Sequence, residues 1–530
     1  MKLHLVFYFA ILGIVGICGS LRAEEPLKNI PALNLLDAEI VKAYDRAARQ
    51  NVLAAVNSEV FPGYWSVCAD GKGFGYGCTY PSLDGHQMTD ALLFLGQVEI
   101  VKANWDYVRK FQRPNGQLPL AILPPLAGKT IGTETAKSTL DPNGGLYVHW
   151  VPGDPLRALA GTTYIQNADV IYRYTQDRKW LLHQLPSVNL AADYLASLTT
   201  EDGAVGGAGY YVERPTRIEY DGVTQCHAID AFRKVAQLNE LAGNHKSTRR
   251  YHKLADLIAT HFRDKFWAKD LFVEYIHPQR GPISSHGLTD VDWSAIATGA
   301  ADTKQISVLW PRLKNEKRFY YGGMPTGIAT LPETYEKWEF TTNDQMDLAA
   351  MGRVWYLECW ARAKMGDGPG LVESIRKVCR EGRKNGYYWR ERYTDKGAHG
   401  VEKYCEYPAN LIRIVQRFLL GVEFDLDGTI LLAPTAPDDF WKAGCGQTLN
   451  WRGRTLSYRF YRDHMSGHYC GESPQRLCVR FPKPGHKTAA RATINGSPAE
   501  ATSTEDGKVF VLLPATPTER PCRFDIQVIK

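Results

Sequence analysis

Helical periodicity that recurs from residue 36 to residue 421 is the feature that most restricts the fold of this chain. Apolar residues return every three or four positions in successive segments, and polar or Gly/Pro-rich stretches separate these segments. The predicted helices cover residues 36–57, 87–112, 162–177, 186–199, 224–243, 246–266, 291–299, 302–315, 343–365, 369–383 and 407–421.

Several of these helices form pairs with short connections. One helix ends at Gly243-Asn244 and the next begins near Ser247, and glycine is a typical residue just after a helix. Each helix of such a pair must bury one face against its neighbours, so consecutive pairs close most simply into a ring. We therefore predict a mainly α fold, an (α/α)6 toroid.

The sequence after Gly421 has a different texture. Short β-type runs are expected at 430–432, 455–461, 477–481, 492–494, 509–513 and 523–529. Asn495-Gly496 favours a tight hairpin turn, although with Ser497 it also forms a glycosylation sequon. These runs predict a small β-sandwich over 424–530, behind a toroid over 24–423.

The N-terminus resembles an export signal. Lys2 precedes an apolar run over 5–17, and Ala23 offers a small residue for cleavage, so we expect residues 1–23 to be a signal peptide. The run is too short to span a bilayer. Cys18 leaves a lipoprotein as the alternative. The expected location is secreted or periplasmic.

Charge and cysteine content exclude several classes of protein. The net charge of +6 is modest, and no dense Lys/Arg run suggests nucleic acid as a partner. Export permits disulfides, with Cys68/Cys78 and Cys470/Cys478 as candidate local pairs, whereas three cysteines in helical patterns are expected to be buried thiols: Cys226, Cys359 and Cys379. No CxxC or HExxH motif occurs, and we expect no metal or other cofactor.

Long loops between the helical pairs suggest a binding function. They carry Trp, Tyr, His, Asp and Glu rather than Ser/Gly filler, and loops of this length in a compact domain are usually functional or disordered. The chain contains 13 Trp and 28 Tyr, and such rings can stack on sugar faces or fill a core. A carbohydrate substrate is therefore expected.

Glu219 and Asp221 are the candidate catalytic acids. Hydrolysis of a glycosidic bond with inversion needs one carboxylic acid and one carboxylate, about 6.5–9.5 Å apart. Both residues lie in a loop just before a predicted helix, where desolvation beside Tyr220 could raise a pKa. The alternative is that Asp221 caps the helix and Glu219 pairs with Arg217.

Glu391 and Glu406 are the candidate bases, with Glu402 behind them. Glu391 lies between Trp389 and Tyr393, and Glu406 directly precedes the last predicted helix of the toroid. Each glutamate has a basic neighbour, so surface salt bridges are the alternative, and the sequence does not choose between the two candidates.

A further group of polar and aromatic residues could bind sugar hydroxyls or stack on a sugar ring. The segment from Asp84 to Asp90, which includes His86, offers paired donors and acceptors. The remaining candidates for substrate binding are Trp150, Gln166, Asp169, His227, Trp338, Asp344, Trp389, Glu402 and Tyr404.

Four segments resemble six-hairpin glycosidases. The loop over 111–119 contains Gln112, Asn115-Gly116 and Leu118-Pro119. The stretches over 148–154 and 169–177 are similar to family 78 α-L-rhamnosidases and their relatives. So are Leu419–Val422, Asp427-Gly428, Leu431 and Pro434, which resemble the exit from their toroid into a C-terminal β-domain.

The resemblance implies an (α/α)6 barrel and an inverting mechanism. Glu219 and Asp221 stand in a place like the acid loop of glucoamylase-type members, and the run from Glu402 to Tyr407 is similar to the base region of trehalases. One difference is that rhamnosidases carry a Glu before a Gly-Trp ahead of the first long helix, where this chain has Asp84-Gly85-His86.

The sequence leaves three functions in competition. The first is a secreted, inverting glycoside hydrolase acting on oligo- or polysaccharides, with α-L-rhamnosidase-like activity as one form. The second is a polysaccharide lyase on a uronate-containing glycan, in which His86, His227, Tyr220 or Tyr404 would remove a proton. The third is a sugar-binding protein without catalysis.

Overall fold

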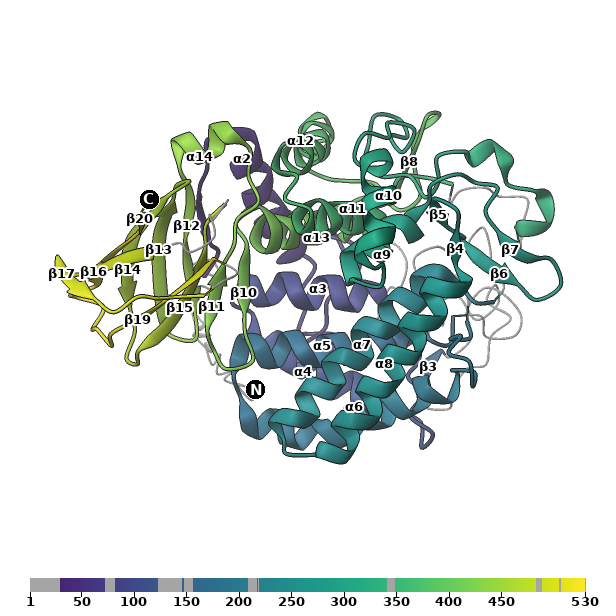
Figure 1. Ribbon diagram of the computed structural model, residues 1–530, viewed down its shortest axis with the longest axis horizontal. Coiled ribbons are helices and arrows are strands. Elements are labelled where there is room, and N and C mark those ends of the chain that lie inside the picture. The colour runs from purple at the N-terminus through teal and green to yellow at the C-terminus, as the bar shows by residue number, and fades with distance from the viewer. Residues whose placement is uncertain are drawn as a thin grey trace, which may run out of the picture.

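The computed structural model combines a helical part with a sheet-rich part (Figure 1). No helix in the part of the chain that it describes is both long and apolar enough to cross a bilayer. The expected signal peptide, Trp150, Asp344 and Cys78 lie outside the described residues. These are residues 29–71, 82–122, 145–146, 156–207, 217, 219–340, 348–482, 489–504 and 507–529.

Six of the helices in these ranges form a closed circuit of contacts. Each packs against the next in chain order, and the last packs against the first. Most of these helices are buried on nearly every side, as in α9, where all residues are buried. The six helices are α3 (Leu83–Phe94), α5 (Leu159–Thr175), α7 (Gly222–Leu241), α9 (Asp290–Thr298), α11 (Gly352–Lys364) and α13 (Glu406–Ile414).

A second set of helices packs against this circuit from outside. Each outer helix packs against the circuit helix that directly precedes it in the chain. The exception is α2, which packs against the last circuit helix, α13. These helices are amphipathic: α8 buries Tyr251, Ala255 and Ile258 at helical spacing and exposes its other face. The set is α2 (Ala38–Arg46), α4 (Val98–Arg109), α6 (Arg178–Ser197), α8 (His245–Lys265), α10 (Thr303–Leu313) and α12 (Gly368–Lys384).

The prediction of a single helix over 87–112 was wrong, because α3 and α4 are separate. Gly96 ends the first of them with a φ of 74°, and a Cβ there would lie 2.6 Å from the Asn29 side chain. The predicted helices at 36–57 and 407–421 end in wider π-helical turns, η1 (Ala47–Val52) and η4 (Val415–Leu419).

The sheet-rich part contains two sheets with a shared apolar interior. Phe460 of one sheet and Phe481, just after a strand of the other, lie 5.1 Å apart between ring centroids. The seven-stranded sheet has the order β1 (Ala32–Asn34), β12 (Cys445–Trp451), β13 (Arg454–Phe460), β14 (His464–Cys470), β20 (Cys522–Ile529), β16 (Ala489–Ile494) and β17 (Ser497–Ala499). The five-stranded sheet has the order β10 (Val422–Phe424), β11 (Ile430–Leu432), β15 (Gln475–Arg480), β19 (Lys508–Leu513) and β18 (Thr502–Ser503).

The predicted strands are confirmed, but the sequence missed the short strands β10, β17 and β18 as well as two long strands, β12 and β14. Both contain residues that weaken a strand pattern, such as Gly446 and Gly467. The hairpin turn is also confirmed, because Ile494 pairs with Ser497 and Asn495 and Gly496 have φ values of 52° and 81°.

Strand β1 comes from the N-terminal end of the described chain, yet it belongs to the C-terminal sheet. Ala32 pairs with Thr448 and Asn34 with Gly446 in an antiparallel register. This pairing was not expected from a division into residues 24–423 and 424–530. The two parts of the molecule are therefore joined by backbone hydrogen bonds as well as by side-chain packing.

The circuit helices direct their C-terminal ends toward the sheets. Phe94 at the end of α3 and Tyr174 near the end of α5 both contact Phe424 of β10, with ring centroids 6.3 and 5.0 Å apart. Helix α13 continues through η4 into β10. The N-terminal ends of these helices consequently lie at the end of the circuit away from the sheets (Figure 1).

The cysteine expectations need correction. Cys470 and Cys478 do not form a disulfide, because they lie on β14 and β15 in different sheets, and Cys68 is also a free thiol. The expectation of buried thiols is confirmed at Cys226, Cys359 and Cys379.

Gly421, at the junction of the two parts, supplies a test of this packing. It has a φ of 64°, and an added Cβ would lie 2.1 Å from the Ala433 carbonyl carbon. Gly453 has a similar φ of 70° but nothing within 4 Å of that position. We expect Gly421→Ala to lower the thermal unfolding midpoint far more than Gly453→Ala, whose backbone strain alone costs about 1–2 kcal/mol. Equal shifts in differential scanning fluorimetry would contradict the close contact.

Candidate active site

The N-terminal ends of the circuit helices are framed by loops that pair with one another. Isolated β-bridges join Asp221 to Tyr275, Thr289 to Ala329, Gly327 to Ala350, Ala350 to Tyr393 and Cys68 to Tyr404. Two small hairpins, β6 (Tyr275–His277) with β7 (Gly281–Ile283) and β8 (Arg392–Thr394) with β9 (Gly397–His399), belong to the same frame. This frame fixes the positions of most of the predicted carboxylates.

Asp84 lies in the first turn of α3 and contacts the loop before α13. Its Oδ1 accepts a hydrogen bond of 2.8 Å from the Tyr404 hydroxyl. Burial raises the pKa of Asp84 and the nearby charge of Glu391 raises it further, while Arg353 and the Tyr404 hydrogen bond oppose this shift. Two predicted binding residues and one predicted base are thus brought into one cluster.

Glu391 is almost completely buried in that cluster. Its Oε1 lies 2.7 Å from the Arg392 guanidinium, and its Oε2 accepts a hydrogen bond of 3.1 Å from the Val401 backbone N–H. Gly400 leaves the space for the carboxylate, because a Cβ there would lie 2.6 Å from Oε2. The carboxylate is therefore held by Arg392 of β8 and by Val401, which follows β9.

Glu406 is the first residue of α13 and ties this helix to α11. The Arg353 guanidinium donates to its Oε2 from Nη2 at 2.8 Å and from Nε at 3.0 Å. Burial raises the pKa of Glu406, with the Arg353 charge opposing the shift. The Arg353 ion pair joins two circuit helices and leaves Glu406 no exposed surface, whereas Glu391 lies in a loop and pairs with its own sequence neighbour Arg392. The geometry therefore favours Glu391 over Glu406 as the base.

Glu402 lies apart from the cluster. Its side chain is 72% exposed and pairs with Arg390. The alternative of a surface salt bridge therefore describes Glu402 better than the predicted role in substrate binding.

Glu219 is held in the loop before α7 by a residue from the loop before α5. Nη2 of Arg157 lies 2.7 Å from Oε1 and 3.0 Å from Oε2, and the Gly207 backbone N–H donates to Oε1 at 2.6 Å. The side chain of Glu219 keeps 19% of its surface exposed. The alternative pairing of Glu219 with Arg217 was wrong, since Arg217 contacts other carboxylates.

Asp221 is the N-cap of α7 and is fully buried. One oxygen accepts from the Thr224 backbone N–H and hydroxyl, both at 2.8 Å, and the other lies 2.8 Å from Arg217. Both oxygens are occupied by structural contacts, so the geometry supports the capping alternative rather than acid catalysis.

Arg217 is the centre of a buried ion network that the sequence analysis missed. Its guanidinium contacts Asp221, Glu274 and Asp290 at 2.7–2.8 Å, and all four side chains have no exposed surface. Glu274 also contacts His286, which reaches Glu339 at 3.2 Å on its other side. Burial opposes the charge on His286, but its bonds to these two glutamates raise its pKa to about 9. The network connects the starts of α7 and α9 to the loop before α11.

Several predicted binding residues lie deeper within the circuit. Gln166 donates to Asp230 at 2.8 Å and contacts His227 at 3.2 Å, and His86 contacts Asn167 at 2.7 Å. Burial lowers the pKa of both histidines to about 3, so both are neutral at physiological pH. They could exchange hydrogen bonds with a neutral ligand but carry no charge.

Asp90 and Asp169 are both committed to ion pairs. Burial disfavours the charge on Asp90, but Arg417 and Arg413 more than offset this and hold its pKa well below the usual range. Asp169 lies 2.8 Å from Arg173, which also reaches Asp425 beside the sheets. Asp169 therefore lies toward the end of the circuit that faces the sheets, away from the N-terminal ends of the helices. Its predicted role in substrate binding is not supported.

The two described tryptophan candidates have different environments. Trp389 is buried, and its indole N–H donates to the Val378 carbonyl at 3.0 Å, so it is a packing residue rather than a binding platform. Trp338 is half-buried in the short helix η3 (Lys337–Glu339), with the Arg280 guanidinium 4.0 Å from its ring centroid. Trp338 remains a candidate.

Comparison with solved structures confirms the resemblance to six-hairpin glycosidases at the level of the fold. An α-L-rhamnosidase from Dictyoglumus thermophilum aligns with a TM-score of 0.57 and 11% identity, over 94% of this chain and 50% of its own. A GH78 family rhamnosidase of Bacillus sp. GL1 aligns with a TM-score of 0.62 and 12% identity, over 86% of this chain and 43% of its own.

A shorter neighbour matches a smaller share of the chain. The GH63 mannosylglycerate hydrolase from Thermus thermophilus aligns with a TM-score of 0.51 and 11% identity, over 70% of this chain and 98% of its own. The present chain spans half or less of the length of the two rhamnosidases. No protein-family model matches the sequence, and neither does any curated protein.

The His286 contacts lead to a pH prediction. Because the pKa of His286 is raised from 6.5 to about 9, its stabilising contribution is complete below about pH 6.5 and is lost as the pH rises through 9. We expect His286→Gln to reduce the decline in the thermal unfolding midpoint between pH 6.5 and 9. The contribution of His286 to the free energy of unfolding that is lost over this range is at most about 3 kcal/mol. His464→Gln, which changes an exposed histidine beside Asp463, is the control. Parallel profiles for wild type and His286→Gln would contradict the buried charge.

Proposed function

We propose that this protein is a glycoside hydrolase, exported from the cytoplasm, that cleaves oligo- or polysaccharides within an (α/α)6 toroid. The observation that carries the proposal is the gathering of carboxylates at the N-terminal ends of the helix circuit. Asp84, Glu391 and Glu219 all lie at this end. Their carboxylates are held there by Tyr404, Arg392 and Arg157, respectively. The fold of the structural neighbours, whose names include rhamnosidases and a mannosylglycerate hydrolase, supports the same interpretation.

Glu219 and Glu391 are the proposed catalytic pair. Glu219 precedes α7 and Glu391 precedes α13, and these helices are three steps apart in the six-helix circuit, on opposite sides of it. Adjacent packed helices lie about 8–10 Å apart, and side chains extend about 5–6 Å from each axis. The gap between opposite side chains is then roughly 4–10 Å, which overlaps the separation that an inverting mechanism requires.

In this mechanism the acid protonates the leaving oxygen while the base accepts a proton from the attacking water. The guanidiniums of Arg157 and Arg392 hold the two carboxylates in fixed orientations. Asp84, with the Tyr404 hydroxyl on one oxygen, offers its other oxygen to a sugar hydroxyl. The neutral His86 and His227 suit a neutral sugar deeper in the circuit.

Two substitutions test the pair. Glu219→Gln and Glu391→Gln should each lower kcat on the cleaved substrate by about 10²–10⁴-fold, because each removes one proton transfer. Glu402→Gln removes a carboxylate from the same loop but from an exposed surface ion pair, and should retain near wild-type turnover. A panel of aryl glycosides, beginning with α-L-rhamnosides, would provide the substrate and the release of phenol the measurement.

The panel also separates acid from base. A variant lacking the acid should recover on dinitrophenyl glycosides, whose leaving group needs no proton, whereas a variant lacking the base should stay impaired on every leaving group. Near wild-type rates in both glutamine variants would overturn the assignment. An unsaturated, ultraviolet-absorbing product from a uronate polysaccharide, without phenol release, would replace the hydrolase with a lyase.

A further inference from the structure

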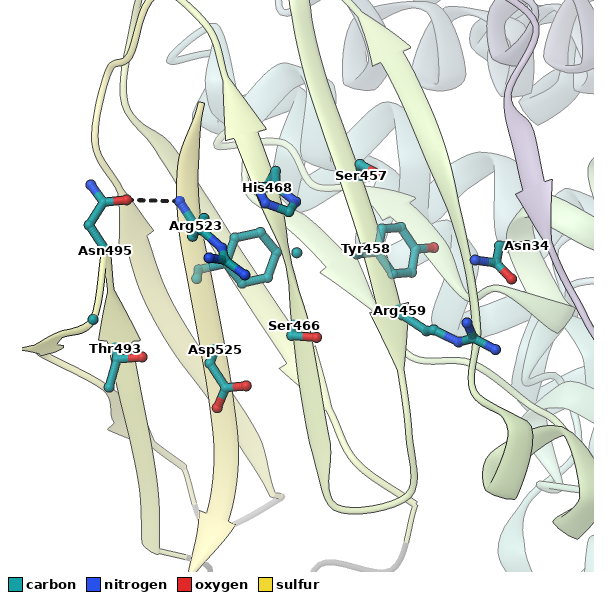
Figure 2. Close-up of a pocket in the computed structure, with 13 residues that line it drawn as sticks. Asn34, Ser457, Tyr458, Arg459, Ser466, His468, Thr493, Asn495, Arg523 and Asp525 are labelled. Carbon is teal, nitrogen blue, oxygen red and sulfur yellow. Dashed lines mark hydrogen bonds between the residues drawn. The ribbon is translucent and has the colours of Figure 1, made fainter. Parts of the chain in front are cut away.

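The outward face of the seven-stranded sheet is hollowed into an open groove with a volume of about 660 Å³ (Figure 2). This volume falls within the range of about 300–1,000 Å³ that is typical of ligand sites. Figure 2 shows that its side chains come from neighbouring strands, with Asn495 and Thr493 on one side and Asn34 of β1 on the other.

The strand register places the polar groups in two adjacent rows across the sheet. In the first row Ser457 pairs with His468, and His468 pairs with Arg523. The second row runs through Arg459, Ser466, Asp525 and Thr493. Gly446, which has no side chain, lies between Arg459 and Asn34, and each row contains a serine. These small residues leave the groove open along the middle of the sheet.

Three charged or ionisable side chains of the groove have no partner within the described chain. Neither the guanidinium of Arg523, the carboxylate of Asp525 nor the imidazole of His468 makes a hydrogen bond or ion pair to another described side chain or backbone group. Arg523 contacts Asn495 through its backbone N–H, which donates to Oδ1 of Asn495 at 2.9 Å and leaves the guanidinium uninvolved. Donors and an acceptor therefore stand side by side and free for a ligand.

This mixture of groups selects among ligands. Asp525 would repel an anion, Arg523 and Arg459 would repel a cation, and most of the lining side chains are polar or charged rather than apolar. Sugar hydroxyls both donate and accept, so vicinal hydroxyls can donate to the carboxylate and accept from the guanidinium at once. We propose that the groove is a second, non-catalytic site that binds a short segment of a neutral polysaccharide.

The groove is separate from the candidate active site. The circuit helices turn their C-terminal ends toward the sheets, whereas Asp84, Glu219 and Glu391 lie at the N-terminal ends. A glycan bound in the groove would therefore hold the protein on a polymer without contacting these carboxylates. The proposal does not rest on hydrolase activity.

Affinity electrophoresis of the full chain tests the groove. Native gels would contain galactomannan, xyloglucan, arabinogalactan or dextran, with polygalacturonate as the anionic comparison. We expect at least one neutral polymer to retard the protein, and Asp525→Ala and Arg523→Ala to weaken that retardation about tenfold, as loss of hydrogen bonds to charged groups implies. Gln527→Ala changes an exposed residue of the same strand outside the groove and should leave it unchanged.

Each remaining outcome would overturn the proposal. These are no retardation by any neutral polymer, retardation of both groove variants as strong as that of wild type, or retardation by polygalacturonate alone. Thermal midpoints of the variants should match wild type because the changed side chains face outward. Unchanged aryl-glycoside turnover in the groove variants would separate this site from the catalytic one, so the two proposals can fail independently.

Discussion

The contact between α13 and α3 closes the circuit, and the candidate site depends on it. The carboxylate of Asp90 in α3 forms ion pairs with Arg413 of α13 and Arg417 of η4. In the same contact, Gln87 accepts a hydrogen bond from Asn410 at 3.1 Å. These partners are more than three hundred positions apart in the chain, so closing the ring carries an entropic cost that a buried, well-bonded interface must offset. Because Asp84 and Tyr404 meet at the same seam, the geometry around Glu391 exists only when the circuit is closed.

The sequence predicted the type and order of most elements because their patterns are local. The helical period marked α7 to α10 almost to the residue, and Gly299 and Asn495-Gly496 marked a helix end and a turn by their backbone conformation. Errors arose where tertiary contacts decide. Nothing in the local sequence of 87–112 shows that Gly96 must fit against Asn29. Likewise, nothing local to β14 shows that Gly467 leaves space for the Phe524 ring.

The site was predicted less completely, for a physical reason. Each candidate carboxylate had a basic neighbour in sequence, but the partner of Glu219 proved to be Arg157 and that of Glu406 proved to be Arg353, both from distant segments. Sequence alone could not distinguish a carboxylate held at a rim from one committed to a cap or an interhelical ion pair. Arginines shortly before predicted helix starts, such as Arg157 and Arg217, are the signal that could have revealed such partners.

The pairing of β1 with β12 also sets an order of events during synthesis. Residues 32–34 leave the ribosome about 400 residues before their partners at 446–448, which at roughly 5–20 residues per second is a delay of tens of seconds. During that interval the helical part can assemble, but the first strand has no sheet to join. Completion of the sheet edge is therefore a late step, and until then β1 presents unpaired backbone groups that could recruit another chain.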